Sequence, residues 1–308
     1  MSIAASTRQT YTSGERQYLN FCELFRPPTP TFPATENTLI QFATFLAKTV
    51  KASSIKNYLA AVRHLHIRHG FEFDLKKFHR LQLLLKGIKR VQGAGQKVRL
   101  PITVPHLKLF YYQLAIPTTT SKDSIMLWAA MTLAFFGFLR LSELTGNSRF
   151  SSEVHLTHTD LSFFPNMNDA IYLSILIKAS KTDPFRSGQR ITVGRTNQAV
   201  CPVVAMRNYL SIKSPPPGPL FTFESGKPLT KADLTAQTRS LLSLAGLDSS
   251  EYAGHSYRIG AATSAASVNI PPWLIKVMGR WSSDCFERYV KVPHSVISGV
   301  SEKLVNDI

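Results

Sequence analysis

The sequence predicts a mainly α-helical protein with one small antiparallel sheet. Apolar residues recur at helical spacing along most of the chain, and only the stretch from about 155 to 193 has short runs rich in Ile, Val, Thr and Tyr. At 308 residues the chain is long enough for two domains. We expect a helical domain at 1–92, a linker at 93–104 and a mixed domain at 105–308.

The first ninety residues predict four helices. The first precedes the breaker PPTPTFP at 27–33, and the second carries apolar residues between Leu39 and Leu46. The third is expected to start at a cap on Ser53 or Ser54 and to close at Gly70. The fourth is expected from about Leu75 to Val91.

The second domain is expected to alternate helices with a short sheet. A helix from Thr103 or Pro105 precedes a strongly apolar one, Ser124 to Phe138, which we expect at the buried centre. The runs HLTHTDLSF, AIYLSILIK and QRITVG predict three antiparallel strands. Helical patterns return in CPVVAMRNYL and KADLTAQTRSLLSLAGL, and Trp128 and Trp273 are expected in the core.

The charge distribution favours a polyanionic partner. The chain has 36 Lys and Arg against 19 Asp and Glu, a formal charge of +17, and the first hundred residues hold 16 basic and 5 acidic residues. A solvated surface is the alternative, but the asymmetry favours nucleic acid. The residues expected to contact DNA phosphates are Lys56, Arg63, Arg68, Lys76, Lys77, Arg80, Lys86, Lys89 and Arg90.

Other patterns limit the compartment and the cofactors. No apolar run approaches the roughly 18 residues that cross a bilayer, and the N-terminal segment lacks a signal-peptide core, so we expect an intracellular protein without a membrane partner. The three scattered cysteines predict neither a disulfide framework nor a zinc site. His64, His66 and His69 lack a nearby carboxylate or cysteine, so exposed or DNA-facing roles are favoured over metal binding.

Arg140 stands between two apolar helices and needs a charged partner. Glu143, three residues later, is the local one, and a pair that only pins two helices is the structural alternative. The turn between the last two expected strands carries Lys178, Lys181 and Arg186. A lysine on such a turn can reach a neighbouring cleft and donate a proton, although most such lysines are merely solvated.

The segment from 254 to 290 supplies the remaining chemical groups. His255 and Arg258 are three residues apart and share a face if the segment is helical, and Trp281 and Tyr289 follow. With Arg140 and a lysine they make up the set needed for metal-free phosphoryl transfer through a covalent tyrosine intermediate. The arginines neutralise the transition state, Lys181 protonates the leaving oxygen, His255 assists proton movement, and the indole of Trp281 donates to a phosphate oxygen.

Four segments together resemble the tyrosine recombinases, the phage-integrase family. They are GFLRLSEL at 137–144, SKTD at 180–183, HSYR at 255–258 and GRWSSDCFERY at 279–289. The resemblance implies a helical core-binding domain followed by a mixed catalytic domain. It makes Tyr289 the nucleophile, Lys181 the general acid and Glu143 a supporting residue, with a pocket formed by Arg140, Arg258, His255 and Trp281. The residues of these four segments are most similar to those of recombinases from eukaryotic mobile elements.

Two positions leave a choice between neighbours. Many family members have a histidine nine residues before the tyrosine, where this chain has Arg280, whereas Trp281 is eight before Tyr289. We expect Trp281 in the pocket because the WSSD wording matches the turn that follows the histidine. Lys181 is preferred to Lys178 because SKTD is the better match.

The resemblance implies site-specific DNA recombination through a 3′-phosphotyrosyl bond, with neither a nucleotide cofactor nor a metal. The expected partner is double-stranded DNA, bound by a homotetramer at two sites, and the expected location is the nucleus if the host is eukaryotic. The tail residues Val296, Ile297 and Val300 dock either on a neighbouring protomer or on their own domain. The alternatives are strand relaxation like that of a type IB topoisomerase, a domesticated DNA-binding protein without catalysis, and an unrelated basic helical scaffold.

Overall fold

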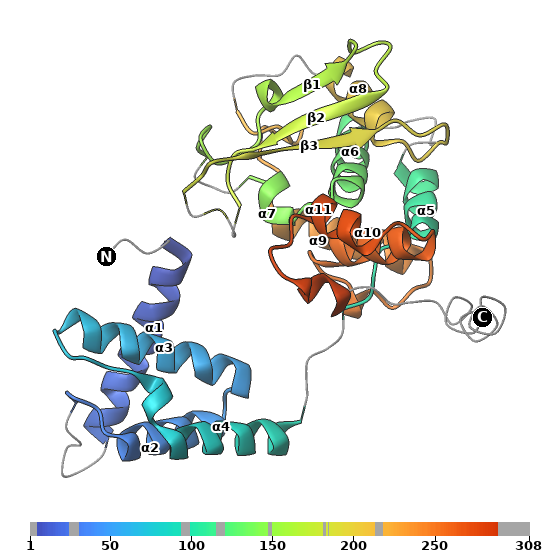
Figure 1. Ribbon diagram of the computed structural model, residues 1–308. Helices are drawn as coiled ribbons and strands as arrows, with labels where there is room; N and C mark the ends of the chain where they lie inside the picture. Colours follow the sequence, from blue (N-terminus) through green and yellow to red (C-terminus); the bar gives the residue numbers. More distant parts are fainter. Residues whose placement is uncertain are drawn as a thin grey trace, which may run out of the picture. The chain divides into compact units, whose positions relative to one another are not determined.

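A computed structural model of the chain describes residues 5–24, 31–93, 99–114, 121–146, 150–180, 183, 185–212 and 218–288. The chain divides into two compact units, Met1–Lys97 and Val98–Ile308, called unit 1 and unit 2 (Figure 1). Unit 1 is helical, and unit 2 combines helices with a three-stranded sheet. The predicted fold class, mainly helical with one small antiparallel sheet, is confirmed.

Unit 1 packs its helices on one apolar core. Its elements are α1 (Ala5–Leu24), α2 (Glu36–Ala47), α3 (Ala52–Arg68), a 3₁₀ turn (Leu75–Lys77) and α4 (His79–Gln92). The apolar stripe of each helix faces this core, and its fully buried side chains include Tyr18, Phe21, Leu39, Phe42, Ile55 and Leu81. The four helices expected in the first ninety residues are therefore present.

The start of α3 differs from the prediction because its cap comes from another helix. α3 begins at Ala52, so Ser53 and Ser54 lie inside its first turn, and the expected serine cap is wrong. The N–H of Ala52 donates to Oε1 of Gln92, at the end of α4, over 2.7 Å. A side chain forty residues away thus satisfies a donor that the serine was expected to take.

The start of α4 is also set from a distance, and the predicted start near Leu75 is wrong. The segment opens with a separate 3₁₀ turn, and α4 itself begins at His79. Oε1 of Glu36, the first residue of α2, accepts the N–H groups of Arg80 (2.7 Å) and Leu81 (3.1 Å). The carboxylate therefore fixes the helix start and lies at the favourable end of the helix dipole.

His66 is fully buried in the core of unit 1, so the expected exposed or DNA-facing role is wrong for this histidine. Its Nε2 accepts the N–H of Ala34 (2.9 Å), which leaves Nδ1 to donate to the carbonyl of Val62 (2.8 Å). The ring also stacks on Phe73, with centroids 4.1 Å apart. Burial lowers the pKa of His66, so the ring is neutral in the folded chain.

Unit 2 is arranged around the apolar helix α6. Every residue from Met126 to Phe135 in this helix is buried. The helices are α5 (Val104–Leu114), α6 (Lys122–Phe136), α7 (Leu141–Leu144), α8 (Pro202–Ile212), α9 (Lys231–Leu244), α10 (Ser256–Ser267) and α11 (Pro272–Gly279), with 3₁₀ turns at His158–Asp160, Ser249–Glu251 and Asp284–Arg288. No helix in the described part of the chain is long and apolar enough to cross a membrane.

The sheet of unit 2 has the order β1-β2-β3 and is antiparallel throughout (Figure 1). Its strands are β1 (Leu161–Phe164), β2 (Tyr172–Ile177) and β3 (Gln189–Gly194). In the register, Ile175 at the centre of β2 faces Leu161 of β1 and Ile191 of β3. The turn between β2 and β3 is the one in which a catalytic lysine was predicted.

Two tryptophans were expected in the core, and one of those expectations is wrong. Trp128 of α6 is buried, but Trp273 of α11 is 66% exposed. α11 buries only Ile275 and Gly279, so an eight-residue helix has no room for the larger ring on its inner face. Trp273 therefore lies on the solvent side.

The end of the expected linker packs on unit 2. The N–H of Leu100 donates to the carbonyl of Glu251 (3.1 Å), and that of Ile102 to the carbonyl of Ser256 (2.9 Å). Ile102 is fully buried, and its backbone lies against Gly260 of α10, where a Cβ would have no space. Residues just after 98 therefore anchor the first turns of α10.

Candidate active site

The turn between α6 and α7 places Arg140 at the start of a short helix. Phe138 has a left-handed backbone (φ 49°), which reverses the chain after α6. Arg140 then precedes Leu141, the first residue of α7. Glu143 closes the turn, because its Oε2 accepts the backbone N–H of Arg140 over 2.9 Å. Its Oε1 accepts from Nη1 of the same arginine over 2.8 Å, so the predicted local partner is in contact.

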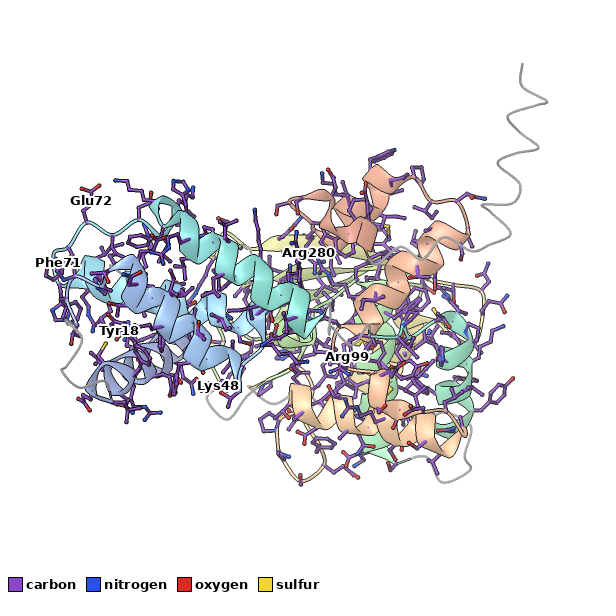
Figure 2. The ribbon with its side chains drawn as sticks, turned by 90° about the horizontal axis from the view of Figure 1, so that it is seen from below. Tyr18, Lys48, Phe71, Glu72, Arg99 and Arg280 are labelled. Atoms are coloured by element: carbon purple, nitrogen blue, oxygen red, sulfur yellow. The ribbon has the colours of Figure 1, made fainter. Side chains whose placement is uncertain are left out.

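A second arginine, Arg280, shares the Glu143 carboxylate. Its Nη2 donates to Oε2 of Glu143 over 2.7 Å, and its Nη1 donates to the carbonyl of Gly137 over 3.3 Å. Arg280, which is labelled in Figure 2, follows α11 in the left-handed conformation (φ 53°). Its side chain is almost fully buried. Burial lowers the pKa of Arg280 while the carboxylate opposes that shift, and a guanidinium keeps its charge in either case.

Arg258 is held by two main-chain carbonyls. It lies in the first turn of α10 and is 3% exposed. Its Nη1 donates to the carbonyl of Phe138 over 2.9 Å, and its Nη2 donates to the carbonyl of Gly279, the last residue of α11. One side chain therefore ties α10 to the α6–α7 turn and to α11. Guanidinium groups suit this role because the last carbonyls of a helix lack partners within it.

Trp281 packs beneath Arg258. The guanidinium carbon of Arg258 lies 4.3 Å from the centroid of the indole ring, which is a cation–π contact. The ring also contacts Phe138 and Phe286. Gly279 lies against the same ring, so a Cβ at that position would collide with it. Trp281 is thus both a core side chain and a support for an arginine of the site.

His255 lies at the exposed start of α10. It is the residue before the helix, whereas Arg258, three residues later, is buried. The structure therefore groups Arg140, Glu143 and Arg258 with Trp281, and it leaves His255 open to solvent at the edge of the same helix.

The arginine cluster carries excess positive charge. Arg140, Arg258 and Arg280 supply three guanidinium groups, and Glu143 supplies one carboxylate, which gives a net charge of +2 in a largely buried layer. Charges removed from water are costly unless they are paired, so an anion that enters this layer is strongly favoured. The planar donors of a guanidinium match phosphate oxygens. The described residues contain no group of His, Cys, Asp or Glu arranged to hold a metal ion.

Lys181 and Tyr289, the predicted general acid and nucleophile, lie outside the described residues. The surroundings of the lysine are described in part: the carboxylate of Asp183 accepts two backbone N–H groups across the β2–β3 turn. The rival Lys178 forms an ion pair with Asp160 over 2.6 Å, and both side chains are largely buried. Lys178 is therefore committed to a structural contact.

Known proteins are similar to this chain in sequence and in fold. No family model matches the chain. The integrase/recombinase XerD homolog of Selenomonas ruminantium is 28% identical over 306 residues, which cover 94% of this chain and 82% of that protein. The XerH site-specific recombinase bound to its difH substrate has a TM-score of 0.60 at 15% identity, over 95% of this chain and 78% of that one. A lambda integrase dimer bound to a COC′ core site has a TM-score of 0.59 at 16% identity, over 94% and 73%. In sequence and in fold the chain is therefore similar to the tyrosine recombinases and integrases.

A third solved structure with a similar fold is an integrase of a transposon. The integrase of the Tn1549 transposon, in complex with a circular intermediate DNA, has a TM-score of 0.58 at 15% identity and covers 96% of this chain and 99% of that one. The three solved relatives are all complexes with DNA. The present chain shares their fold.

The basic residues expected to hold DNA are dispersed over unit 1. Lys56 and Arg63 are exposed on α3. Arg68 is paired with Glu15 over 3.2 Å, and Arg80 donates to a side chain of α2 over 3.1 Å, so both already have protein partners. The remaining candidates are exposed, namely Lys76, Lys77, Lys86, Lys89 and Arg90.

Sequence reasoning did not anticipate the contact between Arg280 and Glu143. A signal existed, because Arg280 has the nine-residue spacing to Tyr289 at which many recombinases carry a histidine. The sequence analysis nevertheless preferred Trp281, because the polar residues after it match the turn that follows the histidine in the family. The deciding feature is the left-handed backbone of Arg280, which turns its side chain towards the α6–α7 turn, and no residue pattern reveals it.

Proposed function

We propose that the chain is a site-specific DNA recombinase that cleaves and rejoins strands through a 3′-phosphotyrosyl intermediate. The observation that carries this proposal is the net charge of +2 on the cluster of Arg140, Arg258, Arg280 and Glu143. A phosphodiester brings one negative charge, and attack by a phenolate adds a second in the transition state. The cluster therefore balances the transition state better than the ground state, which is the requirement for catalysis.

In the proposed reaction Tyr289 attacks the scissile phosphorus. A bond from the phenolic oxygen to phosphorus forms as the bond to the 5′ oxygen breaks, and Lys181 gives its proton to that leaving oxygen. Arg140 and Arg258 hold the non-bridging oxygens, and His255 assists proton movement. A free 5′-hydroxyl of another strand then attacks the phosphotyrosine and releases the tyrosine, so one phosphodiester replaces another.

Two contacts support this assignment of roles. Lys178 is bound to Asp160, which leaves the other lysine of the β2–β3 turn, Lys181, as the proton donor. Trp281 supports Arg258 through its ring, so we assign it a place beneath the phosphate clamp. The choice of Lys181 agrees with the SKTD motif, whereas the sequence suggested that Trp281 donates its indole N–H to a phosphate oxygen.

The proposed DNA surface of unit 1 is the face formed by α1 and α3. The two helices approach closely at Gly14, where a Cβ would lie 2.6 Å from that of Ala61. A groove of about 420 Å³ between them is lined by Gln9, Thr10, Ser13, Val50, Ser54, Asn57 and Tyr58, none of which is acidic. Lys56 and Arg63 add positive charge on α3. Amide and hydroxyl groups flanked by lysine and arginine suit both base edges and phosphates.

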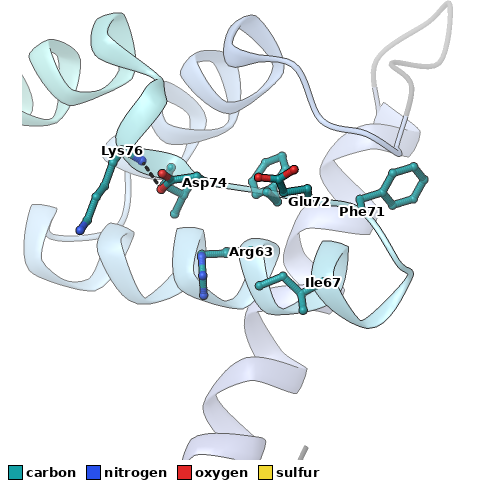
Figure 3. A pocket seen from close by; sticks show the side chains of 8 residues that line it. Arg63, Ile67, Phe71, Glu72, Asp74 and Lys76 are labelled. Carbon is teal, nitrogen blue, oxygen red and sulfur yellow. Dashed lines mark hydrogen bonds between the residues drawn. The ribbon is translucent and has the colours of Figure 1, made fainter.

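A second hollow of unit 1 suits DNA less well. It measures about 690 Å³ and lies between α3 and residues 71–76 (Figure 3). Arg63 and Lys76 border it, but so do the carboxylates of Glu72 and Asp74. These carboxylates repel phosphate, and we therefore favour the α1–α3 face for the main contacts.

Assembly and origin extend the proposal. We propose a homotetramer on two DNA sites, since strand exchange between two duplexes needs four cleavages, and light scattering of the complex with DNA tests it. From the residues of the four motifs we also propose that the chain belongs to the eukaryotic mobile-element branch and acts in the nucleus. That placement rests on the motifs alone, and a tree of recombinase sequences with fluorescence localisation in the host tests it.

Covalent capture on DNA tests the central proposal. The full chain is incubated with a pool of nicked suicide duplexes of randomised sequence, and covalent complexes are recovered, amplified and sequenced. We expect an adduct that carries DNA on Tyr289 by peptide mapping and that is absent in Tyr289→Phe. An adduct that persists in this variant overturns the choice of nucleophile, and no adduct at all favours a binding-only protein.

The captured sequence then separates strand exchange from relaxation. Two duplexes that carry it should yield recombinant products with the wild-type chain. Relaxation of a supercoiled plasmid without recombinants would instead indicate a topoisomerase activity.

A further inference from the structure

Arg280 occupies the closed end of the arginine cluster. Its side chain is 5% exposed and that of Glu143 is 1% exposed, whereas that of Arg140 is 15% exposed. Glu143 bridges the two arginines, with Oε1 on Arg140 and Oε2 on Arg280. An anion that arrives from solvent therefore reaches Arg140 first, and Arg280 lies behind the carboxylate.

We propose that Arg280 is a positioning residue, which holds Glu143 from behind so that Glu143 orients the guanidinium of Arg140 towards the scissile phosphate. This inference rests on the proposed function. It gives Arg280 a role that acts through two neighbours and needs no contact with the DNA.

The hydrogen bonds show how the effect is transmitted. Glu143 uses Oε1 for the Arg140 side chain, and it uses Oε2 for both the Arg140 backbone and the Arg280 side chain. Without Arg280, Oε2 keeps only a neutral N–H partner, and the carboxylate loses its second charged anchor. Charge-assisted bonds are roughly twice as strong as neutral ones, so the orientation of the carboxylate then weakens. Arg140 loses its fixed direction with it.

Arg280 also preserves the positive charge that faces the phosphate. Arg140 and Glu143 alone form a pair with no net charge, which attracts an anion weakly. The second guanidinium raises the net charge of the three groups to +1. In a buried layer this difference is weakly screened by solvent, so Arg140 retains its attraction for a phosphate oxygen.

Arg280 itself is fixed by the main chain around it. Its Nη1 binds the carbonyl of Gly137, and its backbone N–H closes the end of α11 on Val277. Its Nε is buried and has no partner among the described residues. Such a group is costly, and its retention fits a functional requirement better than a purely structural one.

The adjacent residues Trp281 and Arg280 support different arginines. The indole supports Arg258 from below, whereas Arg280 supports Arg140 through Glu143. Two successive residues thus serve the two arginines of the phosphate clamp.

Side-chain NMR of the full chain tests the positioning step without DNA. The Nε–Hε signals of arginine are assigned with Arg140→Lys, and the order of the Arg140 guanidinium is measured in the wild type and in Arg280→Ala. We expect Arg140 to be rigid in the wild type and mobile in the variant. Arg195→Ala, which removes an exposed arginine after β3, is the matched control and should leave Arg140 unchanged. An Arg140 that stays equally ordered in Arg280→Ala overturns the inference.

A charge-neutral substrate tests the same step in catalysis. With the captured DNA sequence, we expect Arg280→Ala to cleave roughly 10- to 100-fold more slowly in a single turnover, the size typical of groups that orient a charged partner. A methylphosphonate at the scissile position lacks the negative charge that Arg140 neutralises, so most of the loss should vanish on it. Equal losses on both substrates indicate a structural role and overturn the inference.

The conservative variant Arg280→Lys guards against misfolding. It keeps the positive charge behind Glu143 with a single donor group, so it should recover part of the rate and part of the Arg140 order. No recovery in a variant that melts like the wild type also counts against the inference. Failure of the proposed function is seen separately, as a wild-type chain that forms no adduct, while the NMR result stands by itself.

Discussion

Units 1 and 2 both bury polar groups, but they differ in how completely those groups are satisfied. In unit 1 His66 uses both ring nitrogens, and Glu15 lies against Arg68 and His64 at a site that solvent still reaches. In unit 2 Arg140 and Arg280 share Glu143 and Arg258 is held by main-chain carbonyls, so these four side chains carry a net positive charge. Complete satisfaction is typical of a structural role, whereas a surplus of one sign indicates a binding site.

The largest difference in stability between the two units is expected when the carboxylate at the centre of each polar cluster is removed. Glu143→Ala leaves three guanidinium groups in one layer, and loss of one partner from a buried ion pair costs about 3–5 kcal/mol. Glu15→Ala removes a carboxylate whose partner Arg68 is 57% exposed, and should cost about 1 kcal/mol or less. Hydrogen exchange of α7 and α10 in one variant, and of α1 and α3 in the other, measures the two costs.

Added phosphate sharpens the comparison. A free anion should bind the excess charge of Glu143→Ala and recover part of its lost stability, with no recovery in Glu15→Ala. Equal costs in the two variants, or equal recovery by phosphate, would contradict the view that only unit 2 carries surplus charge.

Acid should weaken unit 1 through His66, an effect of intermediate size. Burial lowers the pKa of His66, helped by the nearby His69 and opposed by the bond to Val62. The unfolded chain takes up a proton below pH ~6.5 that the folded core excludes, so stability is intact above that pH and is lost as the pH falls. The loss is at most about 1.4 kcal/mol per pH unit.

Thermal melts of α1–α4 amides at pH 7.5 and 5.5 measure this loss. His66→Gln removes the titrating ring and should flatten the pH dependence, whereas the exposed His69→Gln should keep it. A wild-type unit 1 that is equally stable at both pH values would show that the buried imidazole accepts a proton without penalty.

The smallest expected effect concerns the two basic surfaces of unit 1. Lys56→Ala, beside the α1–α3 groove, should lower the slope of log affinity against log salt by about 0.9, the value for one lost phosphate contact. Lys76→Ala, in the hollow that also holds Glu72 and Asp74, should change it less. Filter binding to the captured DNA at 50–200 mM salt measures both slopes, and the reverse order would move the DNA to the second hollow.

Local patterns predicted most of the fold. Apolar spacing identified the four helices of unit 1 and the central helix α6, and short β-branched runs identified the three antiparallel strands. The pair of Arg140 and Glu143 followed from three-residue spacing and the need to pair a charge among apolar residues. These features depend on neighbours in the sequence, which is why a single chain reveals them.

Features set by distant residues escaped prediction. The starts of α3 and α4 are fixed by Gln92 and Glu36, each about forty residues away. Arg280 contacts Glu143, which lies 137 residues earlier in the chain. The contact depends on the left-handed backbone of Arg280, which no sequence pattern predicts. Tertiary contact decided these points where local propensity was silent or misleading.

The end of the short helix α11 holds several residues of the arginine cluster, beginning with the carbonyl of Gly279. It anchors Arg258, the next residue supports Arg140 through Glu143, and the one after that carries the indole. α11 buries only Ile275 and Gly279, so few apolar contacts hold it, and few such contacts are typical of segments that open locally. A local opening of α11 would therefore release both arginines at once, instead of breaking one contact at a time.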